Sequence, residues 1–292
     1  MPGAAGCPRA IAAQGQALAL RLTGPTAADW APDEEDCTVR VFSHTCSNTE
    51  IVCALGCADM LVGVDADSDY PAEVVARLPR PGRDLDLDVG AVRALEPDLV
   101  LTSLTVPGHE RVVEDLRAAG LESVVCDPQS LADIYADIRR IAAALGVPPR
   151  GEALVAQMQA AMPAVALTGA RPPVLVEWWP KPVIAPARRS WVSDLIERAG
   201  GVNPWAGVDA KSLPLETADV QAAAPELIVM SWCGVKAENY RAEVVRRRPG
   251  WAAIPAVAGD RIQPITEAWL GRPGPRLVEG YRRLRALIAG LA

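Results

Sequence analysis

The sequence has 292 residues, of which 50% are hydrophobic, and a formal net charge of −7 at pH 7. This length is sufficient for two domains of ordinary size, and the hydrophobic content is typical of a globular protein and not of a disordered one. Acidic residues outnumber basic residues by 36 to 29. The composition therefore argues against a nucleic-acid partner, whose phosphates would require a basic surface.

The N-terminal segment has few features of an export signal. It carries one early arginine, and Gln14 and Gln16 interrupt its apolar residues. Cys7 follows small residues, as a lipidated cysteine does, but only six residues precede it. No stretch reaches the roughly 18 apolar residues of a transmembrane helix. We therefore expect a cytoplasmic protein that is not embedded in a membrane; the alternative is a periplasmic or other extracytoplasmic protein whose true start, with a signal sequence, lies upstream.

The seven cysteines are odd in number and lack paired spacing, which favours a reducing compartment. Cys53 and Cys57 lie one helical turn apart, and His44 and Cys46 are close in sequence, so a metal cluster is one interpretation. The other is that both cysteines are buried in the core, because they lie among apolar residues. We prefer the core interpretation.

Strands and helices alternate after an N-terminal extension that covers residues 1–37. The first strand is predicted at Val39–Phe42, and Ser47 and Glu50 have the spacing of a capping box for a helix that ends near Leu55. The next predicted elements are strand 61–64, helix 89–95, strand 98–102, helix 108–119 and strand 123–126. This alternation predicts a parallel sheet in an α/β lobe, residues 38–130.

A long, mostly helical pattern separates this lobe from a second one. Apolar residues recur at helical spacing over 131–162, interrupted only at Gly146–Pro149, which predicts a connector at 131–168. Alternation restarts at Val174, so a second α/β lobe is predicted at 172–292. The segment 92–103 is echoed by 220–231: both read as a helix end, a proline turn and a buried strand. Such a long repeat indicates two related lobes and not a solenoid.

Four segments resemble those of the cobalamin-binding and iron-siderophore-binding proteins of ABC importers, and the cobalamin-binding branch is most similar. They are, in chain order, Ser47–Ile51, Leu61–Val64, Ser68–Pro71 and Leu95–Val100. The resemblance covers about residues 38–290 of this chain. It implies an α/β fold of two Rossmann-like lobes joined by a single long backbone helix, with a ligand cleft between the lobes. It also implies a non-catalytic substrate-binding protein for a metal complex, and we expect a monomer.

Tryptophans are the main candidates for ligand contacts. The sequence has eight Trp and one Phe, and seven of the Trp lie in its second half. A corrin or porphyrin presents a wide, flat, partly apolar surface that aromatic side chains match. Loops at strand carboxyl ends bind ligands in open α/β sheets, which favours Trp178, Trp179, Trp232 and Trp269. Trp191 is a further candidate, whereas Trp205 and Trp251 are assigned to the core.

The remaining site candidates are polar. On the first lobe, Cys46, Tyr70 and Arg83 correspond to ligand-facing positions of the family, with Arg83 in place of an aromatic residue. Arg83 could stack on a ring of the ligand or bond an amide or phosphate group. Arg272, which follows Trp269, could do the same. Together these residues predict a cobalamin-like corrinoid as the ligand.

Two other metal complexes remain as alternatives. Heme is one, with His44, Cys46 or Tyr70 on the iron. A ferric siderophore is the other, held by basic residues that include Arg83, Lys181, Arg188, Arg189 and Arg272. The sequence contains no Gly-rich phosphate loop, nucleophile elbow or zinc-protease helix, so we do not expect an enzyme.

Two positions depart from the resemblance. The family docks onto its transporter through one acidic residue per lobe, and these positions align with Gly90 and Ala218. Neither residue is acidic, although Asp88, Glu216 and Asp219 are close by. Docking onto a permease is therefore doubtful, and the sequence indicates a family member detached from import, a cytoplasmic corrinoid carrier or sensor.

Overall fold

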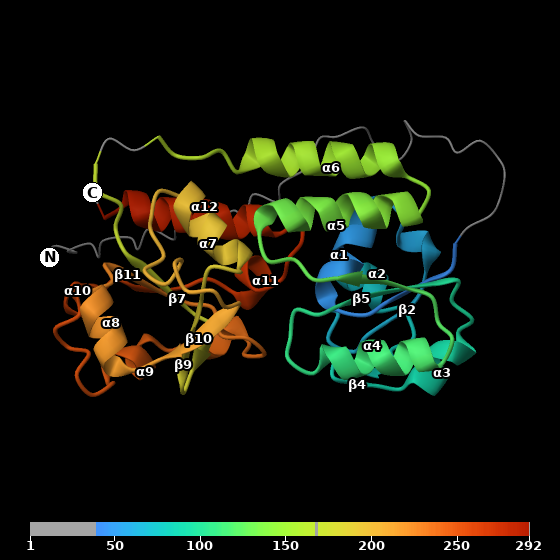
Figure 1. Ribbon diagram of the computed structural model, residues 1–292, viewed down its shortest axis with the longest axis horizontal. Helices are drawn as coiled ribbons and strands as arrows, with labels where there is room; N and C mark the ends of the chain where they lie inside the picture. Colours follow the sequence, from blue (N-terminus) through green and yellow to red (C-terminus); the bar gives the residue numbers. More distant parts are fainter. Residues whose placement is uncertain (1–38, 167–168, 292) are drawn as a thin grey trace, which may run out of the picture. The chain divides into compact units, whose positions relative to one another are not determined.

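The computed structural model describes residues 39–166 and 169–291, which form two α/β lobes and a helical connector (Figure 1). The predicted N-terminal extension lies outside the described residues. Each lobe has a parallel sheet at its centre, as the alternation of strands and helices predicted. The two-lobed α/β fold is thereby confirmed.

The first lobe is built on a four-stranded parallel sheet of order β2-β1-β5-β6. Its strands are β1 (Val41–Ser43), β2 (Leu61–Val64), β5 (Leu99–Ser103) and β6 (Ser123–Cys126). A two-stranded antiparallel ribbon lies beside it, β3 (Gly82–Arg83) and β4 (Asp86–Leu87). The helices of this lobe are α1 (Cys46–Ala54), η2 (Ala58–Met60), α2 (Ala72–Val75), α3 (Val89–Ala94) and α4 (His109–Ala118).

The second lobe has a three-stranded parallel sheet of order β12-β11-β7 and a separate antiparallel sheet of order β10-β9-β8. The parallel strands are β7 (Val174–Glu177), β11 (Leu227–Met230) and β12 (Ile262–Pro264). The antiparallel strands are β8 (Trp179–Pro180), β9 (Val183–Pro186) and β10 (Ser212–Leu215). The helices are α7 (Trp191–Arg198), α8 (Thr217–Ala223), η3 (Ala237–Asn239), α9 (Ala242–Arg246), α10 (Pro255–Ala258), α11 (Glu267–Leu270) and α12 (Leu277–Ala289).

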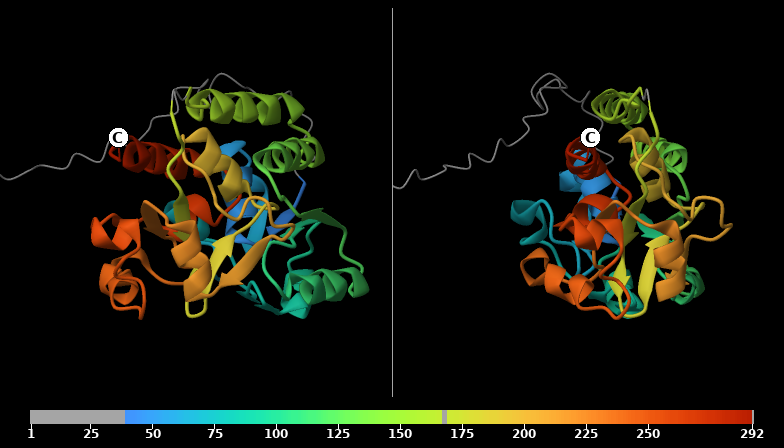
Figure 2. Two further views of the ribbon diagram at one scale, coloured as in Figure 1. Left: turned by 60° about the vertical axis from the view of Figure 1, so that its left-hand side comes forward. Right: turned by 90° about the vertical axis from the view of Figure 1, so that its left-hand side faces the viewer.

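The connector consists of two helices and not of the single long helix that the resemblance implied. α5 (Leu131–Ala144) and α6 (Pro148–Ala161) lie side by side over the first lobe, at the top of Figure 1, and α5 also contacts α7 of the second lobe (Figures 1 and 2). Gly146, with φ 73°, follows the end of α5, and Pro148 is the first residue of α6. A Cβ on Gly151 would lie 2.6 Å from Ala142 Cβ. The glycine therefore allows the two helices to pack closely.

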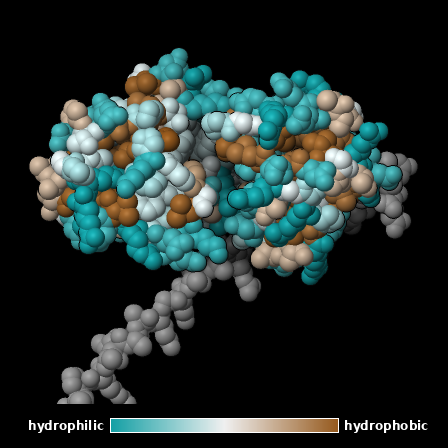
Figure 3. Space-filling view, turned by 90° about the horizontal axis from the view of Figure 1, so that it is seen from below, coloured by the Kyte–Doolittle hydropathy of each residue, from teal (hydrophilic) through white to brown (hydrophobic). Residues whose placement is uncertain are grey.

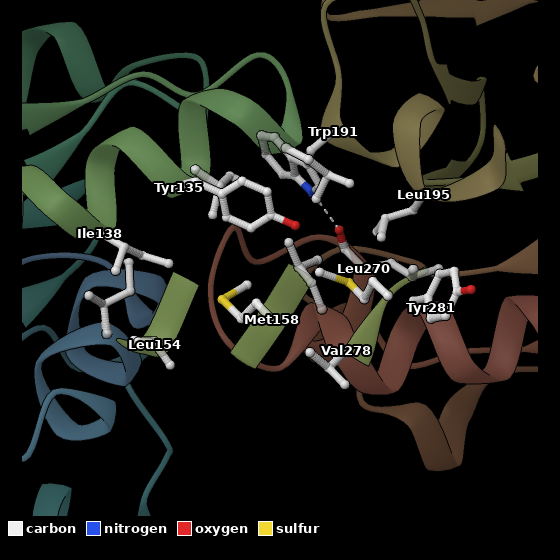
Figure 4. Close-up of a cluster of buried hydrophobic side chains, with 14 of the residues drawn as sticks. Tyr135, Ile138, Leu154, Met158, Trp191, Leu195, Leu270, Val278 and Tyr281 are labelled. Atoms are coloured by element: carbon white, nitrogen blue, oxygen red, sulfur yellow. Dashed lines mark hydrogen bonds between the residues drawn. The ribbon is translucent and has the colours of Figure 1, made fainter. Parts of the chain in front are cut away.

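One hydrophobic core is shared by the connector and both lobes. It contains Ile138 and Met158 from the connector, Val64 from the first lobe, and Leu195 and Tyr281 from the second. Figure 4 shows part of this cluster, with the Trp191 indole donating a 2.8 Å hydrogen bond to the Leu270 carbonyl. Separating the lobes would expose this shared apolar surface to water, which opposes large hinge motions.

Candidate functional site

A cavity of about 830 Å³ lies between the lobes, within the size range of small-molecule sites. Its walls come from segments that follow β1, β5, β7, β11 and β12, so it lies at the strand carboxyl ends of both parallel sheets. Figure 3 shows a furrow between the two lobes, bordered by apolar surface. The predicted inter-lobe cleft is therefore present.

One wall of the cavity is aromatic. Trp178, Trp179 and Trp191 all line it, in agreement with the position predicted for them. Trp179 offers the most surface, because 42% of it is exposed. The ring centroid of Trp178 lies 6.3 Å from that of Trp191, and Trp191 is itself fixed by its hydrogen bond to Leu270. This wall presents a rigid apolar surface to a ligand.

Two predicted tryptophans do not line the cavity. Trp232 is 4% exposed, stacks on Tyr240 and donates a 3.2 Å hydrogen bond to the buried carboxylate of Glu177. Trp269 packs against the shared core, with the Arg283 guanidinium 5.9 Å from its ring centroid. Trp232 and Trp269 were therefore wrongly predicted to face the cavity: Trp232 is buried, and Trp269 is partly buried against the shared core.

The opposite wall is polar and acidic. Arg83 lies there as predicted, but its guanidinium is bound by the Asp67 carboxylate through contacts of 2.9–3.2 Å. The same carboxylate accepts from the Asp84 backbone N–H at 3.2 Å. Cys46 also lines the cavity, and its thiol donates to the Asp67 carbonyl at 3.0 Å. Burial raises the pKa of the Cys46 thiol, which disfavours the thiolate needed to bind a metal.

Arg272 joins the two lobes at the edge of the cavity. Its guanidinium contacts Asp69 at 2.5 Å and Glu50 at 3.3 Å in the first lobe, and Glu267 at 3.5 Å in its own. Arg276 adds a second contact to Glu50, at 3.1 Å. Carboxylates pair with both guanidinium groups, so neither arginine offers an unpaired positive charge to the cavity.

Two expectations about this region were wrong. Tyr70 is 48% exposed and lies outside the cavity, with the Arg276 guanidinium 4.3 Å from its ring centroid. The residue that precedes helix α1 is Thr45, so Ser47 and Glu50 lie inside the helix and do not form its capping box. Glu50 instead turns toward the arginines of the other lobe.

His44 does not reach the cavity, so the structure contradicts its predicted role as an axial metal ligand. The side chain is fully buried, and its two ring nitrogens lie 2.7 Å from Thr102 Oγ1 and 2.7 Å from the Asp84 carbonyl. Burial lowers the pKa of His44 to about 4. His109 is the histidine on the cavity wall, with Nε2 3.5 Å from Asp84 Oδ2. Within 39–166 and 169–291, no three His, Cys, Asp or Glu side chains cluster as a metal site.

Several cavity residues were missed by the sequence interpretation. They are the acids Asp67, Asp69, Asp84 and Glu267, together with Cys233 and Lys236. Of the basic residues considered for a siderophore, Arg188 and Arg189 pair with Asp209 outside the cavity, and Lys181 does not line it either.

The helix starts considered for transporter docking carry acids, but not at the aligned positions. Gly90 and Ala218 lie in the first turns of α3 and α8. Asp88 caps α3 by accepting from the Ala91 backbone N–H at 2.9 Å. Glu216 caps α8 in a capping box with Asp219.

Comparison with known proteins identifies the family. A family model described as periplasmic binding protein matches residues 41–267. An uncharacterized ABC transporter substrate-binding lipoprotein of Bacillus subtilis is 28% identical over 84% of this chain and 78% of its own length. A vitamin B12-binding protein of Vibrio parahaemolyticus is 24% identical over 81% of this chain and 84% of its own length. The solved structure of a periplasmic heme-binding protein from Roseiflexus sp. RS-1, in apo form, matches with a TM-score of 0.73 and 29% identity, over 87% of this chain and 99% of that chain.

These comparisons correct the predicted location. The expectation of a cytoplasmic protein was wrong, because the relatives are named as periplasmic proteins and a lipoprotein. The residues on which it rested, near the N-terminus, lie outside the described residues. No helix in the described part of the chain is long and apolar enough to cross a membrane. The chain belongs to the periplasmic binding protein family and is a non-catalytic substrate-binding protein of the ABC-transporter type.

Proposed function

We propose that this protein binds a corrinoid such as cobalamin in the cavity between its lobes, without catalysing a reaction on it. We further propose that residues 38–130 and 172–292 form the two ligand-binding lobes, that 131–168 connects them, and that 1–37 is an extension. The ligand would lie against the wall of Trp178, Trp179 and Trp191, and would face Cys46, Arg83 and Arg272 on the other side. Vitamin B12-binding relatives support this ligand class.

The observation that carries the proposal is the charge of the wall opposite the tryptophans. Four carboxylates line the cavity, on Asp67, Asp69, Asp84 and Glu267, and both arginines in it are already bound by carboxylates. A corrin ring has a flat apolar centre and a periphery of neutral carboxamides, whose N–H groups can donate to carboxylates. The anionic groups of a ferric siderophore and the two propionates of heme would find no unpaired arginine in this cavity.

Heme is the second candidate, because the heme-binding protein from Roseiflexus is 29% identical to this chain. His109 is the imidazole on the cavity wall, and its buried Nε2 has no hydrogen-bond partner among the described residues. An imidazole nitrogen of this kind can bind heme iron. It would have to displace Asp84, whose carboxylate lies 3.5 Å away.

Calorimetric titration of the purified protein with cyanocobalamin, hemin and a ferric siderophore under identical conditions tests the proposal. We expect one-to-one binding of cyanocobalamin that is tighter than that of the other two. Tight binding of hemin, with a Soret band that shifts in a His109→Ala variant, would show that the ligand is heme and not a corrinoid. The fold assignment would be unaffected. No binding of cyanocobalamin would refute the corrinoid assignment.

Replacing Trp179 with alanine should weaken cyanocobalamin binding by about 1 kcal/mol or more, because the ligand loses its most exposed aromatic contact. The matched control is Val208→Ala, since Val208 is also 42% exposed in the second lobe but does not line the cavity. Calorimetry of both variants at one pH measures the effect. Equal affinities for the two variants would exclude Trp179 from the site.

A further inference from the structure

Three cationic side chains line the cavity, and they differ in whether a carboxylate pairs with them. Arg83 is bound by Asp67, with its Nη2 2.9 Å from Oδ1. Arg272 is bound by Asp69, Glu50 and Glu267. Lys236 is the third, and no carboxylate within 39–166 and 169–291 pairs with it. It is therefore the cationic side chain in this cavity that remains available to an anionic group of a ligand.

The loop that carries Lys236 is anchored to the tryptophan wall. The backbone N–H of Cys233 donates to the Trp178 carbonyl at 3.0 Å. The Tyr240 hydroxyl donates to the Trp232 carbonyl at 3.0 Å, which fixes the loop at its other end. Lys236 thus extends from a tethered loop beside the aromatic surface. Because Trp179 and Lys236 line the same cavity, one ligand can reach both side chains.

Lysine is rare in this chain. Of the 29 basic residues, three are lysines, Lys181, Lys211 and Lys236, and the rest are arginines. Lys211 forms an ion pair across the lobes, with Nζ 2.6 Å from Asp127 Oδ1 and 3.0 Å from the Leu104 carbonyl. An ammonium on a flexible stem suits a compact anion that is approached as a point charge, whereas the arginines of this cavity occupy two-oxygen contacts with carboxylates.

We propose that Lys236 binds the phosphodiester of the nucleotide that a complete cobalamin carries, and so favours complete corrinoids over those without the nucleotide. The inference rests on the proposed corrinoid function. It follows from the balance of charge: of the three cationic side chains in the cavity, this ammonium is the one with which no carboxylate of the described residues pairs. The phosphodiester is the one anionic group at the periphery of cobalamin.

Titration of the wild-type protein and a Lys236→Met variant with cyanocobalamin and with dicyanocobinamide, which lacks the nucleotide, tests the assignment. The variant should bind cyanocobalamin about 3- to 5-fold more weakly at low salt, because one exposed ion pair is lost. Its affinity for dicyanocobinamide should be unchanged. The loss should shrink as salt is added, since an exposed pair is screened. Lys181→Met, an exposed lysine outside the cavity, is the matched control.

Acetylation of the lysines gives a second readout on the unmodified chain. Cyanocobalamin should protect Lys236 from acetylation more strongly than dicyanocobinamide does, while Lys181 reacts equally in both complexes. If wild type binds cyanocobalamin and Lys236→Met loses affinity for neither ligand, or for both equally, the role of Lys236 is refuted and the corrinoid function stands. If wild type binds neither corrinoid, the proposed corrinoid function is itself refuted, and the role of Lys236 falls with it.

Discussion

Replacing Arg248 with alanine is expected to lower the free energy of unfolding by about 3–5 kcal/mol, as is typical when one partner of a buried ion pair is removed. Its two guanidinium nitrogens bind the two carboxylate oxygens of Glu177, which is fully buried. Burial raises the pKa of Glu177, and Arg248 opposes that effect. Without the arginine, Glu177 must either stay charged in the interior or take up a proton. Urea unfolding followed by circular dichroism measures the loss.

Arg246 provides the control, because it lies two residues away and forms ion pairs on the surface. Its partners are Glu243 at 2.6 Å and Asp260 at 2.5 Å, and Asp260 is largely exposed. Arg246→Ala should cost at most about 1 kcal/mol. Equal losses in the two variants would mean that the Glu177–Arg248 pair contributes no more than a surface contact.

The same pair supports the aromatic wall of the cavity. Arg248 Nη2 also donates to the Pro180 carbonyl at 3.3 Å, and Trp232 donates to Glu177 from beneath the neighbouring loop. Trp178 and Trp179 lie between these two anchors in sequence, directly after Glu177. We therefore expect Arg248→Ala to weaken ligand binding as well as stability, although Arg248 does not line the cavity.

Most strands could be predicted from the sequence because each is a short apolar run bounded by proline, glycine or polar residues. The internal echo was also confirmed in detail. Glu96 and Ala224 precede the two matching prolines and adopt nearly the same unusual backbone, with φ 48° and φ 44°. Both lie at a helix end that leads into a buried strand, β5 or β11. The sequence pattern was sufficient to predict this arrangement because the helix end, the proline turn and the strand are all formed by residues that are neighbours in the sequence.

The connector and the start of α1 were predicted incorrectly for a different reason. Over 131–162 the apolar spacing is helical on both sides of Gly146, and spacing alone does not show that the chain reverses there. Glu50 has the right distance from Ser47 for a capping box, but its contacts are Arg272 and Arg276, more than 200 residues away. A long-range ion pair leaves no trace in the sequence near Glu50.

The site was predicted in part. Trp178, Trp179, Trp191, Cys46, Arg83 and Arg272 do line one cavity. Trp179 and Trp232 each lie two residues after the end of a parallel strand, β7 or β11, so sequence could not separate them. What separates them is a hydrogen-bond partner: Trp232 turns inward to Glu177, whereas the described part of the chain offers the Trp179 indole no such acceptor. Three of the missed acids, Asp67, Asp69 and Asp84, lie in loops after β2 and β3, where aspartate is common in turns and gives no specific signal. The fourth, Glu267, begins helix α11.

The stability of the protein should depend on pH through Glu50, which is 3% exposed. Burial raises the pKa of Glu50 to about 7, and Arg276 and Arg272 oppose this only in part. The native protein then holds a proton that the unfolded chain, with an ordinary Glu pKa near 4.5, has released. Wild-type stability should therefore fall relative to a Glu50→Gln variant as the pH rises from about 4.5 to about 7, and the difference should level off above that. The total change is up to about 3 kcal/mol, from roughly 1.4 kcal/mol per unit of pKa shift.

Urea unfolding of wild type and Glu50→Gln at several pH values from 4.5 to 8.5 measures this difference. Subtraction removes titrations common to both proteins, including those of Asp69 and Glu267, which also face Arg272. Glu152→Gln, which removes the exposed partner of Arg139, is the control for the substitution itself. A difference between wild type and Glu50→Gln that does not change with pH would mean that the two arginines fully offset the burial of Glu50. The contacts between the lobes would then be held by charge at every pH tested, and not by a carboxyl group that is partly protonated near neutral pH.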